Sequence, residues 1–298
     1  MNPQATLLEN VPMSRQTAWR AGGVARFGYA PSSEEDLSLF LARHSFSDLP
    51  VVFVGLGSNL LVRDGGLAAL VVFTHRGLSK LSILGHGVDA LFYASSGVAL
   101  PKLARFSANM GYEGAEFMAG IPGSVGGALA MNAGCYGSEV WDCVQRVRTI
   151  TANGEIKERP VSDYLVGYRE VSPKHEGKEF FIGAWFGFVA GDGQKSRARI
   201  SELLKRRVRE QPLSKPNSGS VFRNPDGDFA ARLIESNGLK GRSNGPAVVS
   251  DKHANFIINN GDATAKNIED LIAEVQSEVE CKSGIRLKRE VHIVGDHL

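Results

Sequence analysis

The chain has 298 residues, 43% of them apolar, which is enough to bury a sizeable core and usually divides into two or three packed units. Its formal net charge of +2 is too small to gather nucleic acid or to hold the chain on an anionic membrane. The three cysteines are too few for a disulfide framework, and no apolar run approaches the roughly 18 to 20 residues that cross a bilayer. Because residues 1–16 also lack the apolar centre of a signal peptide, the sequence predicts a soluble, cytoplasmic protein.

Short runs of β-branched and aromatic residues dominate the first part of the chain, each bounded by Gly, Pro, Asn or Asp. They predict strands at residues 51–54, 69–73, 91–94, 144–151 and 180–189. Helical spacing of apolar residues predicts helices near residues 36–41 and 101–110. This mixture is typical of an α+β fold.

The pattern changes at Gly191-Asp192-Gly193, where a basic amphipathic stretch begins. We therefore place a boundary between a first domain, residues 1–192, and a second domain, residues 193–298. In the second domain we expect helices at 195–210, 228–236 and 264–282 and strands at 248–249, 256–258 and 287–294. These elements predict a small α/β domain.

A first glycine-rich segment, Gly55-Leu56-Gly57-Ser58-Asn59, follows the predicted strand at residues 51–54. A strand that opens into such a turn exposes successive backbone N–H groups, which bind anions. Glycine permits the positive φ angles and the close approach that phosphate oxygens require, and Ser58 and Asn59 can add side-chain donors. Taken alone, the segment is more typical of a tight loop that binds nothing.

A second segment, residues 120–137, contains six glycines in eighteen residues. A backbone wrapped around one phosphorylated cofactor explains its glycine, serine and asparagine residues together. The segment lacks the Gly-x-Gly-x-x-Gly pattern of a Rossmann unit and the Gly-Lys-Ser/Thr of a P-loop, so both of these sites are excluded. The two segments together predict a cradle for the phosphates of a dinucleotide.

Both segments closely resemble the FAD-binding segments of the UDP-N-acetylenolpyruvoylglucosamine reductase family, the MurB family of peptidoglycan synthesis. Other motifs of that family follow in the same order over essentially the whole chain: Trp19-Arg20-Ala21-Gly22-Gly23, Gly167-Tyr168-Arg169, Gly219-Ser220-Val221-Phe222-Arg223-Asn224-Pro225 and Arg289-Glu290-Val291. The resemblance implies an FAD-binding domain of the vanillyl-alcohol-oxidase-like (PCMH) type at residues 1–192, with two subdomains at about 1–75 and 76–192. It also implies a smaller C-terminal substrate domain at 193–298, as in the shorter branch of the family, which lacks an inserted substrate-capping loop.

The FAD is expected to be bound without a covalent link. The resemblance implies that its contacts come from Gly55, Leu56, Gly57, Ser58, Asn59, Gly120, Ile121, Pro122, Gly123, Ser124, Gly126, Gly127, Ala128, Asn132, Ala133 and Gly134.

The reaction that the resemblance implies converts the enolpyruvyl ether of UDP-N-acetylglucosamine to the lactyl ether of UDP-N-acetylmuramate, with NADPH as co-substrate. Hydride reaches the terminal alkene carbon through the flavin. Electron density then moves toward the carbon that bears the carboxylate, where an enolate-like dianion must be stabilised and protonated. Such a site needs a cation and an acid.

The resemblance assigns these tasks to three residues. Arg169 would grip the carboxylate through two N–H groups, although the hydroxyl residue that the family often has two positions later is replaced here by Val171. Ser220 would donate the proton, and Glu290 would stabilise the enol-like intermediate. Without the resemblance, the same residues are typical of a surface arginine, a turn serine and a solvent-facing strand glutamate.

Lys215, Arg223 and Asn224 are expected to contact the substrate, because its diphosphate needs cations and donors near Ser220. The histidines and cysteines show no metal-ligand spacing, so no metal is expected. The basic stretch at 195–210 is typical of a solvated helix face, and no nucleic-acid module accompanies it. The chain is expected to bind no nucleic acid and, by default, to be a monomer.

Two alternative functions remain open at this point. A flavin oxidase of the same superfold would act on another substrate and would not use Ser220 and Glu290 in these roles. A non-enzymatic protein that binds a nucleotide sugar or RNA would use the basic helix and would take up no FAD.

Overall fold

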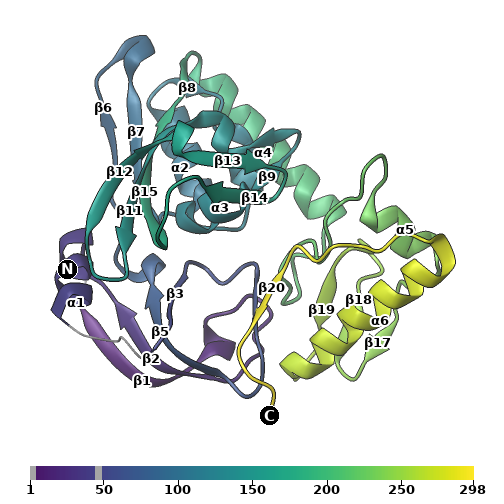
Figure 1. The fold of residues 1–298 in the computed structure, drawn as a ribbon. Coiled ribbons are helices and arrows are strands. Elements are labelled where there is room, and N and C mark those ends of the chain that lie inside the picture. The colour runs from purple at the N-terminus through teal and green to yellow at the C-terminus, as the bar shows by residue number, and fades with distance from the viewer. Residues whose placement is uncertain (1–4, 44–48) are drawn as a thin grey trace. The chain divides into compact units, whose positions relative to one another are not determined.

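The computed structural model describes residues 5–43 and 49–298, and Figure 1 labels their helices and strands. The described residues form two compact units. The first unit contains residues up to Leu8, Phe27–Leu56 and Ala69–Arg206, and the second contains Glu9–Arg26, Gly57–Ala68 and Arg207–Leu298. Each unit is therefore assembled from segments that are distant in the sequence.

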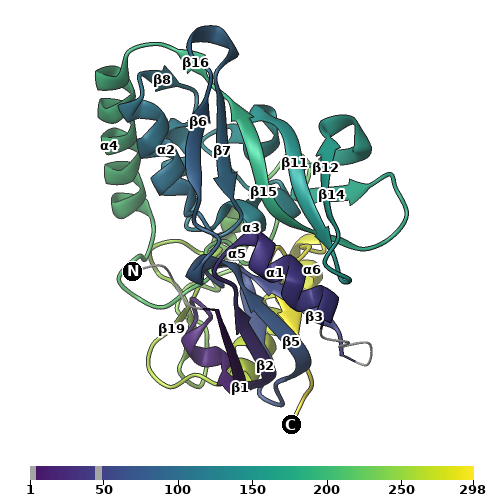
Figure 2. The same cartoon turned by 90° about the vertical axis from the view of Figure 1, so that its left-hand side faces the viewer.

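The main sheet of the first unit has five antiparallel strands in the order β12-β11-β15-β7-β6, which run side by side in Figure 2. These strands are β6 (Leu81–Leu84), β7 (Leu91–Ser95), β11 (Val144–Thr151), β12 (Ile156–Pro160) and β15 (Glu179–Gly187). Val147 of β11 and Phe186 of β15 are fully buried, as expected for β-branched and aromatic residues on the packed face of a sheet. The strands expected near residues 91–94, 144–151 and 180–189 are thus confirmed.

Three helices contribute to the packing of the same unit: α2 (Leu100–Asn109), α3 (Val125–Met131) and α4 (Gly193–Glu210). Leu103 of α2, Phe92 of β7 and Ile200 of α4 belong to one buried cluster. Proline lies in the first turn of α2, where the missing N–H costs no helical hydrogen bond. The periodicity at residues 101–110 therefore predicted this helix correctly.

A second sheet has the strand order β1-β2-β5-β3. Its members are β1 (Thr6–Pro12), β2 (Val24–Ala30), β3 (Val51–Val54) and β5 (Leu67–Phe73). Strands β3 and β5 are parallel, with Val51 opposite Leu70. Helix α1 (Glu34–Arg43) places Leu37 and Phe40 in a buried cluster with Leu70.

Several short elements complete the chain. A hairpin of β13 (Tyr164–Gly167) and β14 (Glu170–Pro173) and the short pairs β8 (Tyr112–Glu113) with β16 (Val189–Ala190) and β9 (Gly134–Cys135) with β10 (Ser138–Glu139) belong to the first unit. Single turns of 3-10 helix occur at Met13–Arg15, Thr74–Arg76, Gly87–Asp89, Glu116–Gly120, Val140–Cys143 and Val161–Asp163.

The second unit contains a small antiparallel sheet, two helices and one parallel strand pair. The sheet has the order β17-β18-β19, with β17 (Ser243–Asn244), β18 (Ala247–Val249) and β19 (Ile257–Asn259), and α6 (Ala265–Ser283) lies against it (Figure 1). Helix α5 (Ala230–Ser236) contacts α6, and β4 (Leu60–Val62) pairs with β20 (His292–Val294).

Helix α6 follows directly from its sequence. The Thr264 hydroxyl accepts a hydrogen bond from the backbone N–H of Asn267, which satisfies one of the free donors at the start of the helix. Gly284 ends the helix in the left-handed conformation, with φ 71°. Between them, the apolar residues at helical spacing, Ile268, Leu271, Ile272, Val275 and Val279, are all buried.

Two element bounds in the second unit differ from the sequence prediction. The helix expected from residue 228 begins at Ala230, because the Asp228 carboxylate accepts a hydrogen bond from the extended Phe229 backbone and from the Arg232 side chain. The strand expected at 287–294 is limited to β20, because only His292–Val294 pair continuously with β4. Arg289 makes a single bridge with Phe222 instead.

Within residues 5–43 and 49–298, no helix is both long enough and apolar enough to span a membrane. The same described residues contain no group of three or more His, Cys, Asp or Glu side chains that could hold a metal ion.

Candidate active site

The two glycine-rich segments meet in the first unit at Gly55 and Ser124. Gly55 follows β3, and Ser124 directly precedes α3. A Cβ atom on Gly55 would overlap the Ser124 hydroxyl, so this approach requires glycine. Ser124 is only 2% exposed, and its hydroxyl has no hydrogen-bond partner in the described part of the chain. An unsatisfied buried donor beside a glycine turn fits a phosphate group.

A cavity of about 390 Å³ opens beside this contact, and all of its lining residues belong to the first unit. Gly55, Gly126 and Gly127 form one part of its wall, and Tyr164 and Phe181 contribute aromatic rings. A lining that combines glycines with aromatic rings fits a dinucleotide, because phosphates bind to exposed backbone N–H groups and a ring system binds to apolar surface.

The adjacent glycines Gly126 and Gly127 of α3 differ in the space around them. A Cβ atom on Gly126 would lie 2.8 Å from the Cβ of Ser96, so Gly126 is needed for packing. A Cβ atom on Gly127 would find its nearest neighbour, the Ser124 hydroxyl, at 3.8 Å, which is ordinary contact. A side chain at Gly127 would therefore meet no close atom outside its own helix among the described residues, and Gly127 leaves open space in the cavity wall.

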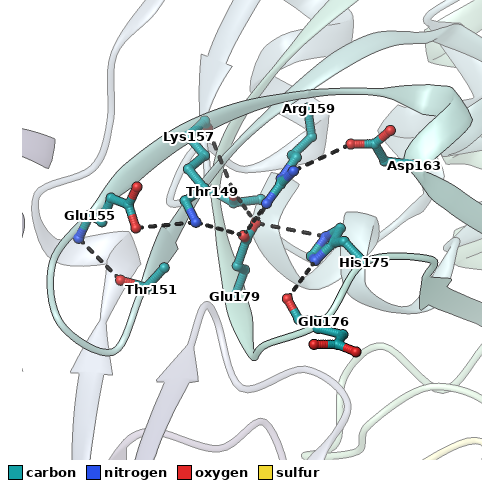
Figure 3. A network of polar contacts seen from close by, with 9 residues as sticks. All are labelled: Thr149, Thr151, Glu155, Lys157, Arg159, Asp163, His175, Glu176 and Glu179. Atoms are coloured by element: carbon teal, nitrogen blue, oxygen red, sulfur yellow. Dashed lines mark hydrogen bonds and ion pairs between the residues drawn. The ribbon is translucent and has the colours of Figure 1, made fainter.

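A network of polar contacts surrounds Glu179, and Figure 3 shows it at close range. Three of its members, Thr149, His175 and Glu179, line the cavity. Glu179, whose side chain is 5% exposed, accepts hydrogen bonds from Thr149 at 2.7 Å and from Arg159 at 2.6 Å. Lys157 and His175 lie 3.7 Å and 3.8 Å from its oxygens. Burial acts to raise the pKa of Glu179, but the bonds from Arg159 and Thr149 and the charges of Arg159 and His175 outweigh it, and the pKa lies below its ordinary value.

Arg169 occupies the turn between β13 and β14 with a positive φ of 57°. Its guanidinium donates to the backbone carbonyls of Asn132, at 3.1 Å, and of Gly134, at 3.0 Å. The Glu139 carboxylate lies 3.5 Å away. The structure thus joins the predicted catalytic arginine to the end of the second glycine-rich segment.

Asn132, which the sequence analysis placed among the FAD contacts, supports this hairpin in the structure. It is 1% exposed, and its side-chain amide donates to the Glu139 carboxylate at 2.6 Å and to the Gly167 carbonyl at 3.0 Å. Its side-chain oxygen accepts from the backbone N–H of Trp141 at 3.3 Å. Sequence reasoning missed Glu139, because no motif marks it.

The remaining expected FAD contacts of the first unit belong to the two glycine-rich segments. Gly120 ends a 3-10 turn, and a Cβ atom there would lie 2.6 Å from the Tyr136 ring. Ile121, Ala128 and Ala133 are buried, Leu56 and Pro122 are exposed, and Gly123 accepts a backbone hydrogen bond from Leu100.

In the second unit, the end of the first glycine-rich segment lies beside Glu290. Gly57 has a φ of 62°, and a Cβ atom there would overlap the Gln16 carbonyl. Ser58 is half-buried in the turn that follows. The Asn59 side chain then donates to the Glu290 carbonyl at 3.1 Å. Asn59 thus has a structural partner in the very segment that carries the predicted catalytic glutamate.

Ser220 and Glu290 belong to neighbouring backbone segments of the second unit. The backbone N–H of Glu290 donates to the carbonyl of Val221 at 2.8 Å, and that of Arg223 donates to the carbonyl of Lys288 at 2.8 Å. These two bonds flank the bridge between Phe222 and Arg289. Both Ser220 and Glu290 are half-buried, so each retains access to a ligand.

The three expected substrate contacts lie near the same segment. Lys215 is exposed and donates to the Asn260 side chain at 2.9 Å. Asn224 is exposed, and its oxygen accepts from the backbone N–H of Ala230 at 3.1 Å. The Arg223 Nε is buried and has no hydrogen-bond partner among the described residues. Burial first, and then the charge of Arg223, lower the pKa of nearby His292, so this imidazole tends to be neutral.

Comparison with known proteins finds two domain models that match this chain. The model of an FAD binding domain matches residues 26–159, and the model of the C-terminal domain of UDP-N-acetylenolpyruvoylglucosamine reductase matches residues 211–294. Fold and site therefore define an FAD-dependent oxidoreductase with an α+β cofactor domain and a separate C-terminal domain.

Full-length relatives make the assignment more specific. UDP-N-acetylenolpyruvoylglucosamine reductase of Thiobacillus denitrificans is 54% identical, and the match covers 97% of this chain and 92% of that protein. The enzyme of Nitrosomonas eutropha is 50% identical, with 98% and 89% covered. The crystal structure of the enzyme from Thermus caldophilus matches with a TM-score of 0.81 at 28% identity, covering 97% of this chain and 98% of that one. The chain belongs to the UDP-N-acetylenolpyruvoylglucosamine reductase family, which confirms the resemblance found in its motifs.

Proposed function

We propose that the chain reduces the enolpyruvyl ether of UDP-N-acetylglucosamine to the lactyl ether of UDP-N-acetylmuramate, a step of peptidoglycan precursor synthesis. The observation that carries this proposal is the backbone pairing that holds Ser220 next to the Glu290 segment, within a chain that its relative matches over 97% of its length. FAD supplies the transfer of hydride from NADPH to the terminal carbon of the enolpyruvyl double bond.

Residues of the first domain, 1–192, would hold the FAD, and residues 193–298 would bind the substrate. The unsatisfied Ser124 hydroxyl and the open space beside Gly127 support a phosphate contact there. Gly55, Ser58 and Asn59 would add donors from the first glycine-rich segment. The aromatic rings of the cavity would contact a ring system of the cofactor.

Arg169 would stabilise the substrate carboxylate as negative charge grows on it. Its guanidinium is charged at every relevant pH and offers donors in a fixed plane. Two of its nitrogens are already held by the carbonyls of Asn132 and Gly134, which fixes the plane of the group before substrate arrives. A charge that is oriented in advance needs no reorganisation during the reaction.

Ser220 would donate its hydroxyl proton to the carbon that bears the carboxylate. The C–H bond forms as the O–H bond breaks, and the serine oxygen regains a proton from solvent after the product leaves. Arg223, three positions later, supplies positive charge that would favour the transient alkoxide. Glu290 would stabilise the enol-like intermediate, and Lys215, Arg223 and Asn224 would contact the diphosphate.

The remaining parts of the proposal concern the setting of the enzyme. We expect it to act in the cytoplasm, as a monomer, without a nucleic-acid partner and without insertion into a membrane. The small net charge of +2 supports the absence of a nucleic-acid partner.

Anaerobic stopped-flow spectroscopy tests the proposed reaction. The FAD-loaded protein is reduced with one equivalent of NADPH and mixed with the enolpyruvyl nucleotide sugar, and the flavin absorbance is followed. We expect rapid reoxidation with formation of UDP-N-acetylmuramate. Reoxidation by oxygen but not by this substrate would instead identify an oxidase, and a protein that takes up no FAD would exclude both enzymes.

A further inference from the structure

Asn255 binds the backbone directly after Ser220 from the opposite side to Glu290. This residue lies between β18 and β19 and is 4% exposed. Its side-chain oxygen accepts from the backbone N–H of Phe222 at 2.9 Å, and its side-chain nitrogen donates to the carbonyl of Phe222 at 2.8 Å. Its own carbonyl accepts from the N–H of Val221 at 2.9 Å.

The segment from Ser220 to Arg223 is therefore held along both edges. Residues Lys288 and Glu290 bond one edge through their backbones, and Asn255 bonds the other, largely through its side chain. One asparagine amide here takes the place of a neighbouring strand, because it offers both a donor and an acceptor to the same residue. The amide also satisfies two buried backbone groups of Phe222 that no strand reaches.

We propose that Asn255 is a positioning residue for proton donation by Ser220. The inference rests on the role of Ser220 in the proposed function. A hydroxyl must meet the accepting carbon at a fixed distance, and a displacement of about 1 Å can lower a rate by about a hundredfold. Because Asn255 fixes the two residues that follow Ser220, its loss would displace the hydroxyl without removing it.

Asn259 provides a matched control within the same unit. It is also buried, at 3% exposure, and its side chain makes three comparable bonds with the backbone, to Trp19, Gly261 and Ala263. None of these partners belongs to the segment from Ser220 to Arg223. Loss of the Asn259 amide should lower stability by the same mechanism as loss of the Asn255 amide, but it should not displace the Ser220 hydroxyl.

The test compares Asn255→Ala and Asn255→Asp with Asn259→Ala and Asn259→Asp. For each FAD-loaded variant, flavin reduction by NADPH and flavin reoxidation by the enolpyruvyl nucleotide sugar are measured in separate single-turnover experiments. We expect the Asn255 variants to be reoxidised about 10 to 100 times more slowly than the wild type, with reduction changed less than about twofold. The Asn259 variants should match the wild type in both half-reactions.

The double variant that combines Asn255→Ala with Ser220→Ala separates a failure of the role of Ser220 from a failure of the role of Asn255. In that background, Asn255→Ala should slow reoxidation no further, because the hydroxyl it positions is already absent. Normal reoxidation of Ser220→Ala itself would reject the proposed role of Ser220. Slow reoxidation of Ser220→Ala with normal reoxidation of the Asn255 variants, or with a fully additive double variant, would reject the positioning role alone.

Folding is checked through melting temperature and bound FAD. If both Asn255 variants fail to retain FAD while both Asn259 variants retain it, Asn255 is required for folding rather than for positioning, and the proposal is overturned. Equal slowing of reoxidation in the Asn255 and Asn259 variants would overturn it as well, because the effect would then follow general loss of stability.

Discussion

The backbone N–H of Glu290 donates a 2.8 Å hydrogen bond to the carbonyl of Val221, the residue after Ser220. The bond brings Ser220 and Glu290, which lie far apart in the sequence, into neighbouring backbone segments, and the proposed reaction uses both residues. It also predicts that changes at the two positions affect the same half-reaction.

Glu290→Gln should therefore slow reoxidation of the reduced flavin by substrate, by about tenfold or more, and leave reduction by NADPH unchanged. Glutamine keeps the shape of the side chain but cannot donate or accept a proton as a carboxyl group does. Stopped-flow measurement of both half-reactions checks this result. Glu280→Gln, which changes a half-buried glutamate of α6 that pairs with Arg286 in the same unit, is the control and should behave as the wild type. Slowed reduction in Glu290→Gln would contradict the assignment.

Gly127→Ala should weaken FAD binding by about tenfold or more without lowering the stability of the FAD-free protein. A methyl group at this position meets no protein atom closer than 3.8 Å, and alanine favours a helix over glycine by about 1 kcal/mol. A loss of affinity would therefore come from contact between the methyl group and the bound FAD. Titration of the FAD-free protein, followed by flavin fluorescence, gives the affinity.

Gly126→Ala is the matched comparison in the same helix. Its methyl group would lie 2.8 Å from Ser96, so it should lower the melting temperature of the FAD-free protein. Unchanged FAD affinity in Gly127→Ala would show that the cofactor does not lie against this part of the wall.

Arg169→Lys should slow reoxidation by about a hundredfold, although the positive charge is kept. A lysine ammonium cannot bond the carbonyls of Asn132 and Gly134 and still present a planar pair of donors to a carboxylate. Arg146→Lys, which changes an arginine that stacks on Trp185, is the control for a general effect of the substitution. Equal rates for Arg169→Lys and the wild type would exclude two-pronged binding of the carboxylate.

Glu179→Gln should lower the free energy of unfolding by about 1 to 3 kcal/mol near neutral pH, because a buried carboxylate with two short hydrogen bonds is replaced by an amide. The pKa of Glu179 in the folded protein lies below its unfolded value, so its ionisation contributes stability above the unfolded pKa. That contribution is lost as pH falls from the unfolded pKa through the folded pKa.

Urea unfolding at pH 7 and at about pH 4 measures this difference between wild type and Glu179→Gln. The difference should shrink in acid. Glu158→Gln, which removes a half-exposed partner of Arg146, should change stability by less than about 1 kcal/mol at either pH. A Glu179 difference that grows in acid would contradict the direction of its pKa shift.

Local sequence features predicted the helices and the main strands well. The hydroxyl cap of Thr264, the buried spacing from Ile268 to Val279 and the left-handed Gly284 mark α6 in the sequence. The distant Asp64 carboxylate then accepts hydrogen bonds from the first backbone N–H groups of the helix. Strand β20 shows where such prediction stops. Alternation continues from Leu287, but pairing depends on where β4 lies, and β4 offers partners only to His292–Val294.

Residues of the candidate site that lie in a motif could be named from the sequence, and those that distant segments contribute could not. The sequence indicated a phosphate-binding site at the segments that contain Gly55 and Ser124, and the structure brings these two residues together. Each compact unit combines segments that are far apart in the sequence, and no local sequence pattern indicates which segments come together. Glu139, Glu179 and Asn255 act through bonds to residues far away in sequence, so nothing beside them marks their tasks.

Ser220→Ala, compared with Ser218→Ala, tests the proposed mechanism most directly. Ser218 is a buried neighbour whose hydroxyl has no partner among the described residues, so Ser218→Ala controls for the removal of a hydroxyl from the same turn without breaking a hydrogen bond of the protein. In anaerobic single-turnover experiments, Ser220→Ala should be reduced by NADPH at the wild-type rate and reoxidised by the enolpyruvyl nucleotide sugar about 10² to 10⁴ times more slowly. Equal reoxidation rates for Ser220→Ala, Ser218→Ala and the wild type would contradict proton donation by Ser220.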